Sequence, residues 1–138
     1  MEILKQKFAT LQMALAKLEK SVARYEVSKT YDEERFEEYR DSLIQRFEYC
    51  TDLLWKVLKV YLEKVEGLQV ASPKSVFREC YAKGILTEEG AEDFLLMVDA
   101  RNTTSHVYRA EFADFLYKRI PGYYVRMREL VNKLSAQL

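Results

Sequence analysis

Glycine and proline are scarce in this chain of 138 residues, which contains four Gly and two Pro. An all-β protein built on many tight turns needs more of both, so that class is excluded, together with collagen-like and low-complexity chains. Hydrophobic residues make up 49% and charged residues 32%, a balance that supports a core and argues against intrinsic disorder. The length is typical of one domain spanning residues 1–138.

Histidine and cysteine are also rare, with one His and two Cys in the chain. Neither Cys belongs to a CxxC pair, and this set is too small for a structural zinc site. We therefore expect no metal, and nothing in the composition indicates another cofactor. Cys50 and Cys80 each lie in a helix-like segment, so we expect two reduced thiols packed in the interior.

A net charge and a long apolar run are missing as well. Lys+Arg and Asp+Glu both number 22, so any contact with phosphate has to come from a local cluster of cations rather than from bulk charge. No apolar stretch approaches the ~20 residues that cross a bilayer. The first 20 residues interleave Lys and Glu with Leu, unlike a signal peptide. We therefore expect a soluble, cytoplasmic protein with no membrane partner.

Helical periodicity runs through almost the whole sequence. An apolar residue recurs every three or four positions over 4–25, which predicts a first helix ending by residue 29. A second, long helix is predicted over 32–65, with Thr30 and Glu33 as a capping box and Gly67 as its stop.

Three shorter helices follow in the prediction. They are a helix over 72–83 with Ser72 as N-cap and Pro73 at its first position, a helix from the cap Thr87 toward Arg101, and a helix from 109 to the C-terminus, interrupted at 120–122. The segment 102–105 is poor in helix formers and predicts a break. The fold class is therefore all-α: a five-helix up-and-down bundle built on a long antiparallel hairpin of the two N-terminal helices.

The segment 101–108, RNTTSHVY, contains the only histidine, close to an arginine. Residues five apart on a regular helix diverge by about 140°, so a break is needed for Arg101 and His106 to point into one cleft. Arg101 and Tyr108 are seven apart and share a face even on an unbroken helix. Histidine can take and give a proton near neutral pH, and arginine offers a charged fork to phosphate oxygens. Such a pair suits RNA cleavage without metal.

Two interpretations of this segment stay open on the residues alone. One His serves one proton transfer at a time, and a symmetric dimer with two such segments face to face would supply both a base and an acid. In the structural interpretation, His106 packs or caps a helix junction, and Arg101 pairs with Asp93, Glu92 or Asp99. An RxxxxH string is short, and its spacing alone favours the structural interpretation.

The segment 101–108 resembles the RxxxxHxY motif of the HEPN superfamily, in the toxin branch that is paired with minimal nucleotidyltransferases. Further stretches resemble a branch called nucleotidyltransferase substrate-binding proteins. In chain order they are 40–48 (RDSLIQRFE), Trp55-Lys56, Ser72-Pro73-Lys74 with Arg78-Glu79, and 101–106. The resemblance keeps its order over nearly the whole chain.

This resemblance implies a single HEPN-like helical domain over 1–138, a homodimer, and a minimal nucleotidyltransferase partner encoded nearby. It implies, as the leading hypothesis, a metal-independent endoribonuclease toxin, neutralised when the partner attaches AMP to the motif tyrosine. Arg101 and His106 would then be catalytic, Asn102 supporting and Tyr108 the AMP acceptor, with RNA as substrate and a nucleotide as a further ligand. The alternative is a non-catalytic substrate-binding subunit of a two-component nucleotidyltransferase.

Three weaker features have two interpretations each. The acidic run over 32–41 is a docking face for the partner or a solvated helix face with i,i+4 pairs. The tyrosines 31, 39, 123 and 124 line an interface or pack at the edge of the core. Arg126, Arg128 and Lys133 supply positive charge to an RNA path or are ordinary surface cations.

Overall fold

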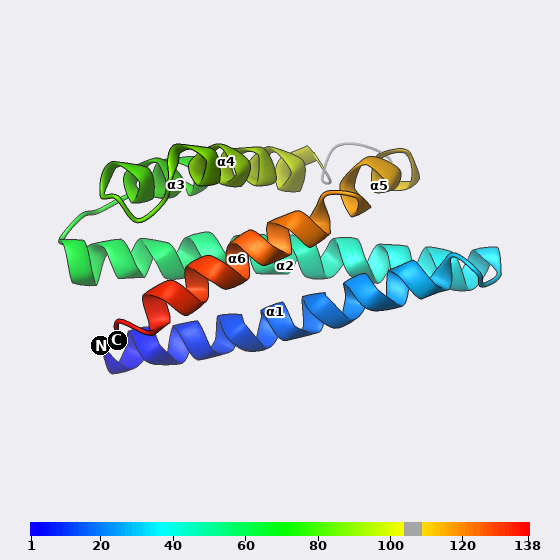
Figure 1. The fold of residues 1–138 in the computed structure, drawn as a ribbon, viewed down its shortest axis with the longest axis horizontal. Helices are drawn as coiled ribbons and strands as arrows, with labels where there is room; N and C mark the ends of the chain where they lie inside the picture. The colour runs from blue at the N-terminus through cyan, green and yellow to red at the C-terminus, as the bar shows by residue number, and fades with distance from the viewer. Residues whose placement is uncertain (104–108) are drawn as a thin grey trace.

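Six helices make up the residues that the structure describes, 1–103 and 109–138, and no strand occurs among them. In this computed structural model they are α1 (Glu2–Ser28), α2 (Glu33–Glu66), α3 (Pro73–Ala82), α4 (Glu88–Thr103), α5 (Arg109–Tyr117) and α6 (Ile120–Ser135) (Figure 1). The all-α prediction is confirmed. None of these helices, within the described ranges, is both long and apolar enough to cross a membrane.

α1 and α2 form the predicted long antiparallel hairpin and lie side by side along most of their length (Figure 1). Their facing sides carry the predicted apolar stripes, because the buried residues include Leu4, Phe8, Leu11, Leu15 and Leu18 on α1 and Leu43, Phe47, Cys50, Leu54, Val57 and Tyr61 on α2. At the open end of the hairpin, Phe8 and Tyr61 meet edge to face with their ring centroids 6.3 Å apart. Burial of this seam supplies a large part of the hydrophobic stabilisation.

The shorter helices cover the hairpin from two directions. α3 and α4 pack beside α2, and their aromatic rings Phe77 and Phe94 stack with centroids 4.8 Å apart. α6 runs diagonally across the hairpin from α5 toward the start of α1 (Figure 1). Its buried Tyr124 donates a hydrogen bond to Glu19 of α1 over 2.5 Å. The two chain ends lie next to each other at one end of the molecule, and the turn between α1 and α2 lies at the other (Figure 1).

The N-terminus of α2 differs from its prediction. Its cap is Asp32, whose Oδ1 accepts the backbone N–H of Arg35 over 2.9 Å. Thr30 instead donates its hydroxyl to the carbonyl oxygen of Val27, so it closes the end of α1. The predicted capping box of Thr30 and Glu33 was therefore wrong, because an aspartate two positions later is an equally good cap and sits directly before the first helical residue.

Three other helix boundaries follow their prediction. Gly67 ends α2 in the left-handed region at φ 66°, which only glycine adopts at little cost. Ser72 caps α3 through a reciprocal capping box with Ser75, and Pro73 begins that helix. Thr87 accepts the backbone N–H of Gly90 over 3.0 Å at the start of α4.

The end of α4 corrects the predicted break. The helix continues through Asn102 and Thr103, and the hydroxyl of Thr103 donates to the carbonyl oxygen of Asp99 over 2.8 Å. This hydrogen bond to the preceding turn satisfies the Thr103 hydroxyl within the helix. The low helix propensity of Asn102 and Thr103 therefore did not end α4. The other two residues of the predicted break, Thr104 and Ser105, lie outside the described residues.

The last predicted helix is divided in two, as its proline suggested. α5 ends at Tyr117, and α6 begins at Ile120 with Pro121 in its first turn, where a missing N–H costs nothing. The interruption therefore covers residues 118 and 119, whereas the predicted residues 120–122 form the first turn of α6. With α5 and α6 counted as the two parts of one interrupted helix, the predicted count of five agrees with the six helices described.

The two cysteines are buried, free thiols, as predicted. Burial raises the pKa of Cys50 and of Cys80 to about 12. Both side chains are therefore protonated at neutral pH and behave as packing residues, because only the thiolate is reactive.

Candidate functional site

Arg101 is held between two helices by two carboxylates. Its Nε and Nη2 donate to Oδ1 and Oδ2 of Asp52, each over 3.0 Å, and its Nη1 donates to Oε2 of Glu48 over 2.9 Å. The pair with Asp52 has the two parallel hydrogen bonds that make an arginine–carboxylate contact strong and geometrically specific. We call Glu48, Asp52 and Arg101 the Arg101 cluster.

The positions of these residues on their helices explain the cluster. Glu48 and Asp52 are four residues apart on α2 and therefore share a face, which is turned toward α4. Arg101 lies in the last turn of α4, where a cation interacts favourably with the helix dipole. The cluster thus joins the middle of the long hairpin to the end of α4, directly before residues 104–108.

The predicted local partners of Arg101 were wrong. Asp93 accepts hydrogen bonds from Arg126 over 2.8 Å, and Asp99 pairs with Lys74 over 2.6 Å. Asp99 precedes Arg101 by two positions, about 200° around the helix, and Asp93 lies more than two turns away. Packing of α4 on α2, rather than spacing within α4, therefore decides which carboxylates meet Arg101.

The cluster is half-buried and carries a net charge of −1, from one guanidinium and two carboxylates. The side chain of Arg101 is 23% exposed, that of Glu48 16% and that of Asp52 38%. The hydrogen bond to Asp52, and then the nearby charges of Asp52 and Glu48, raise the pKa of Arg101 against the opposing effect of burial. Arg101 is therefore always charged, and a phosphate at this place needs at least one further cation beside it.

The structure describes two of the four residues predicted for the site. Arg101 is in the cluster, and Asn102 follows it on the exposed side of α4. His106 and Tyr108 lie outside the described residues. The geometry among Arg101, His106 and Tyr108 therefore stays a prediction.

Sequence reasoning missed Glu48 and Asp52. Glu48 belongs to the stretch 40–48 that carries the family resemblance, but no role was assigned to it. The available signal was two carboxylates four residues apart in α2, placed beside the buried positions Phe47 and Thr51. Acidic residues at the edge of an apolar stripe are rarely buried without a cationic partner, so this pattern predicts an arginine or lysine from another helix.

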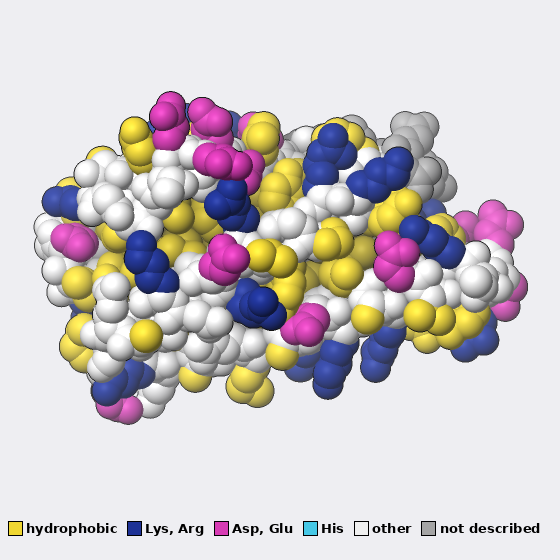
Figure 2. Space-filling view, in the orientation of Figure 1, with side chains coloured by type: hydrophobic (Ala, Val, Ile, Leu, Met, Phe, Trp, Pro, Cys, Tyr) yellow, Lys and Arg dark blue, Asp and Glu magenta, His cyan; other side chains and the backbone are white. Residues whose placement is uncertain are grey.

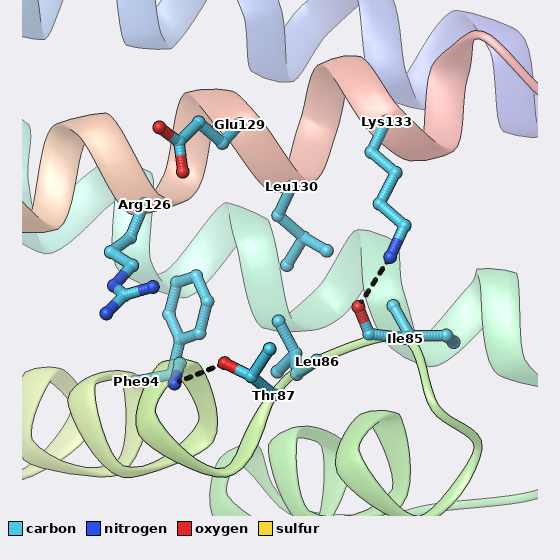
Figure 3. Close-up of a pocket in the computed structure, with 9 residues that line it drawn as sticks. Ile85, Leu86, Thr87, Phe94, Arg126, Glu129, Leu130 and Lys133 are labelled. Atoms are coloured by element: carbon cyan, nitrogen blue, oxygen red, sulfur yellow. Dashed lines mark hydrogen bonds between the residues drawn. The ribbon is translucent and has the colours of Figure 1, made fainter.

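A second feature is a hollow of about 150 Å³ between the start of α4 and α6 (Figure 3). Leu86, Phe94 and Leu130 form its apolar lining, and Arg126 and Lys133 stand at its rim (Figure 3). Lys133 donates to the carbonyl oxygen of Ile85 over 2.9 Å. Because both rim cations are engaged within the fold, the hollow offers an anionic ligand no cation that is free to bind it.

Metal ligands do not gather anywhere in the part of the chain that the structure describes. Within those ranges no group of three His, Cys, Asp or Glu side chains is arranged to hold a metal ion. The acidic run over 32–41 is instead exposed along the start of α2, where Asp41 pairs with Arg40 over 3.2 Å.

Comparison with solved structures places the fold among known helical proteins. A protein from Thermus thermophilus has 36% identical residues and a TM-score of 0.78, and the match covers 90% of this chain and 98% of that one. The tri-AMPylated HEPN toxin of Shewanella oneidensis, solved in complex with the MNT antitoxin, has 15% identity and a TM-score of 0.78, with 99% and 98% covered. A mutant of the toxin–antitoxin MntA-HpeT has 15% identity and a TM-score of 0.79, with 99% of each chain covered.

The last two likenesses, at 15% identity, concern the fold alone. No curated protein matches the chain by sequence. The sequence pattern of one family matches residues 6–136, which is nearly the whole chain. This protein therefore belongs to the family described as "Nucleotidyltransferase substrate binding protein like".

Proposed function

We propose that this protein is a metal-independent endoribonuclease of the HEPN type, the toxin of a pair whose antitoxin is a minimal nucleotidyltransferase. The observation that carries the proposal is the Arg101 cluster, which holds the motif arginine at the end of α4, directly before the segment that contains His106 and Tyr108. Two protonated, buried thiols fit a reducing compartment, which supports a cytoplasmic location.

In the proposed reaction, His106 removes the proton of a ribose 2′-hydroxyl, and the oxygen attacks the adjacent phosphorus. The bond from phosphorus to the 5′-oxygen breaks, which yields a 2′,3′-cyclic phosphate and a 5′-hydroxyl. That hydroxyl takes its proton from the histidine of the second protomer. Arg101 stabilises the charge that builds up on the phosphate oxygens.

The charge of the Arg101 cluster supports the proposed homodimer. One guanidinium in the cluster faces two carboxylates, so binding of a phosphate beside it needs further cations. A second protomer placed face to face would add its own motif cations to the same cleft. We therefore assign the active cleft to the dimer interface, with Asn102, which follows Arg101, as the supporting residue beside it.

The proposed regulation is AMP transfer to Tyr108. The tyrosine hydroxyl attacks the α-phosphorus of ATP bound to the nucleotidyltransferase, and pyrophosphate leaves. The attached phosphate brings a negative charge that Arg101 attracts, and the adenosine occupies the space that RNA needs. The Shewanella oneidensis HEPN toxin of similar fold is described as tri-AMPylated and bound to its MNT antitoxin, which supports this scheme.

The family description favours a second candidate, the non-catalytic subunit that presents substrate to a nucleotidyltransferase. In that role the Arg101 cluster has a structural function only, which is to fix α4 on α2. The two candidates share the partner and differ in whether RNA is cleaved.

RNA cleavage by the purified protein, free of its partner and in excess EDTA, tests the leading candidate. We expect wild type to cleave and His106→Ala to lose the activity, with both variants folded by circular dichroism and both binding the nucleotidyltransferase. No cleavage by wild type whose intact mass shows no AMP adduct would favour the substrate-binding subunit. Unmodified protein that is co-produced with its partner and still does not cleave would refute control through Tyr108.

A further inference from the structure

One side of the α1–α2 hairpin carries cations that have no carboxylate partner among the described residues. Five of them are Lys17, Lys20 and Arg24 on α1, and Arg46 and Lys56 on α2. Lys17 and Arg46 line one hollow in the groove between the two helices, and Arg24 lines a second. None of the five forms a salt bridge with any residue in the described ranges. In Figure 2, Lys and Arg side chains project from the edge of the molecule formed by α1. We call these five residues the basic strip.

The carboxylates of the same stretches are engaged by residues of other helices. The only acidic residue over 17–24 is Glu19, which accepts the hydroxyl of Tyr124 from α6. The only acidic residues over 46–56 are Glu48 and Asp52, which are engaged by Arg101 of α4. A chain with no net charge therefore separates its charges across the hairpin, and the strip is positive.

Exposed apolar and aromatic side chains lie between these cations. Met13 is 67% exposed and Tyr49 55% exposed, and both line a hollow of about 280 Å³ together with Lys17 and Arg46. A second hollow of about 220 Å³ lies further along the same groove, lined by residues that include Arg24 and the ring pair Tyr31 and Tyr39, whose centroids are 6.0 Å apart. Positively charged side chains and exposed apolar or aromatic side chains therefore alternate along the basic strip.

This composition distinguishes between two anionic partners. Protein–protein interfaces are depleted in lysine at their centre, whereas the strip has lysine at three of its five positions. Grooves that bind single-stranded nucleic acid combine Lys and Arg along the backbone with aromatic rings on which bases stack. The strip therefore fits a single-stranded polynucleotide better than an acidic protein.

The strip is also continuous with the Arg101 cluster across α2. Tyr49 precedes Asp52 by three positions and Lys56 follows it by four, so all three are neighbours on the surface of α2. Arg46 is one turn from Tyr49 on the side toward α1. A strand that lies on Lys17, Arg46 and Tyr49 reaches Asp52 and Arg101 without crossing another helix.

We propose that the basic strip binds single-stranded RNA, with its cations on the phosphates and Tyr49 stacked on a base. The identity of this RNA as a substrate rests on the proposed function, but the binding itself does not require cleavage. A strand bound along the strip would pass over α2 to the end of α4.

Binding of a fluorescent 2′-O-methyl oligouridine, which has no 2′-hydroxyl and cannot be cleaved, tests the strip by anisotropy over a series of KCl concentrations. The strip variant is Lys17→Gln/Arg24→Gln/Arg46→Gln. The matched control is Lys59→Gln/Lys64→Gln/Lys83→Gln, which removes the same charge from exposed residues that have no salt bridge within the described ranges. Because each phosphate contact contributes ~0.7 to the salt slope for a single strand, we expect the slope of the strip variant to fall by about 2.

The expected result is a loss of affinity of at least about tenfold for the strip variant and little change for the control. Tyr49→Phe should bind like wild type and Tyr49→Ala several-fold more weakly, because the ring and not the hydroxyl stacks. No binding by wild type, equal losses in the strip and control variants, or a strip variant that binds like wild type would each overturn the proposal. Loss of the nucleotidyltransferase complex with RNA binding intact would also overturn it, and would make the strip a protein-docking surface.

The oligonucleotide result is separable from the proposed catalysis. If the protein binds RNA through the basic strip but never cleaves it, the proposed nuclease activity is refuted and the proposed RNA binding by the strip is retained. If wild type and the strip variant both cleave RNA and bind it with the same affinity, the proposed RNA binding by the strip is refuted and the proposed nuclease activity is retained.

Discussion

Asp52 binds Arg101 with both of its oxygens and, together with Glu48, sets where the motif arginine points. The pair spans α2 and α4, so it fixes a side chain and also joins two helices. Its geometry leaves one edge of the guanidinium to Glu48. Catalytic groups are effective only when their rotamers are locked in this way, so Asp52 and Glu48 are positioning residues in the proposed nuclease.

Replacing Asp52 by Asn removes the charge and one of the two acceptors. We expect Asp52→Asn to lower the free energy of unfolding by about 1 kcal/mol, since the pair is bidentate and partly screened by solvent. We also expect the kcat for RNA cleavage to fall more than KM changes. Urea denaturation and steady-state kinetics measure the two effects.

The control for this variant is Asp41→Asn, because Asp41 also pairs with an arginine but is 51% exposed. It should change stability by less than about 0.5 kcal/mol. Equal effects of the two substitutions, or an Asp52→Asn protein with unaltered kinetics, would mean that Asp52 does not position Arg101.

The buried thiols make stability depend on alkaline pH. Their pKa values are about 12 when folded, against an ordinary value of 9.0, so above pH 9 the unfolded chain loses these protons first. The folded state then binds more protons than the unfolded state, and stability falls as pH rises, by up to ~1.4 kcal/mol per pH unit for each thiol. Urea denaturation from pH 7.5 to 10 should therefore show a shallower decline for Cys50→Ala/Cys80→Ala than for wild type. Parallel pH profiles would contradict this account.

Helix ends show, at the scale of the element, what could be predicted from sequence and what could not. Gly67 and Pro73 act through their own backbone conformations and Ser72 through its side-chain cap, so their positions were predicted correctly. The end of α4 was predicted too early, because Thr103 finds an acceptor on the preceding turn, a choice that composition does not reveal. A helix end can be predicted from sequence where a single residue determines its position.

The partners of Arg101 in the Arg101 cluster were not predicted, for a different reason. Its partners are 49 and 53 residues away along the chain, and they meet only because α4 packs on α2. The sequence pattern predicted both helices. It did not predict which charged residues at the borders of their apolar faces would meet.

Two glycines should respond oppositely to alanine. Gly67 has φ 66°, a conformation strained for any residue with a Cβ, so Gly67→Ala should destabilise the protein by about 1 kcal/mol. Gly122 lies in α6 without a positive φ, and a Cβ there would meet nothing within 4 Å, so Gly122→Ala should be neutral or stabilise by up to about 1 kcal/mol. Thermal unfolding of the two variants checks the difference in sign. Destabilisation by both would mean that the first turn of α6 tolerates no side chain at this position.

On the scale of the whole molecule, the zero net charge conceals an uneven arrangement of charges. The face over α6 seen in Figure 2 mixes acidic and basic side chains, and several of its cations are engaged within the fold, as Arg126 is by Asp93. The groove on the other side of the hairpin has cations and no carboxylates over 17–24 and 46–56 that face it. Binding to a polyanion is therefore expected to depend strongly on salt even though the protein is neutral.

The neighbouring positions of the two chain ends have a practical consequence for handling this protein. A peptide handle, a fluorophore or a surface anchor attached at either end would stand at the pole away from the α1–α2 turn (Figure 1). A molecule tethered in this way leaves its far pole, and α5 with it, pointing into solution. The same proximity would let a short peptide join the two ends, so that new ends could be opened in the exposed connection between α2 and α3 without cutting any helix.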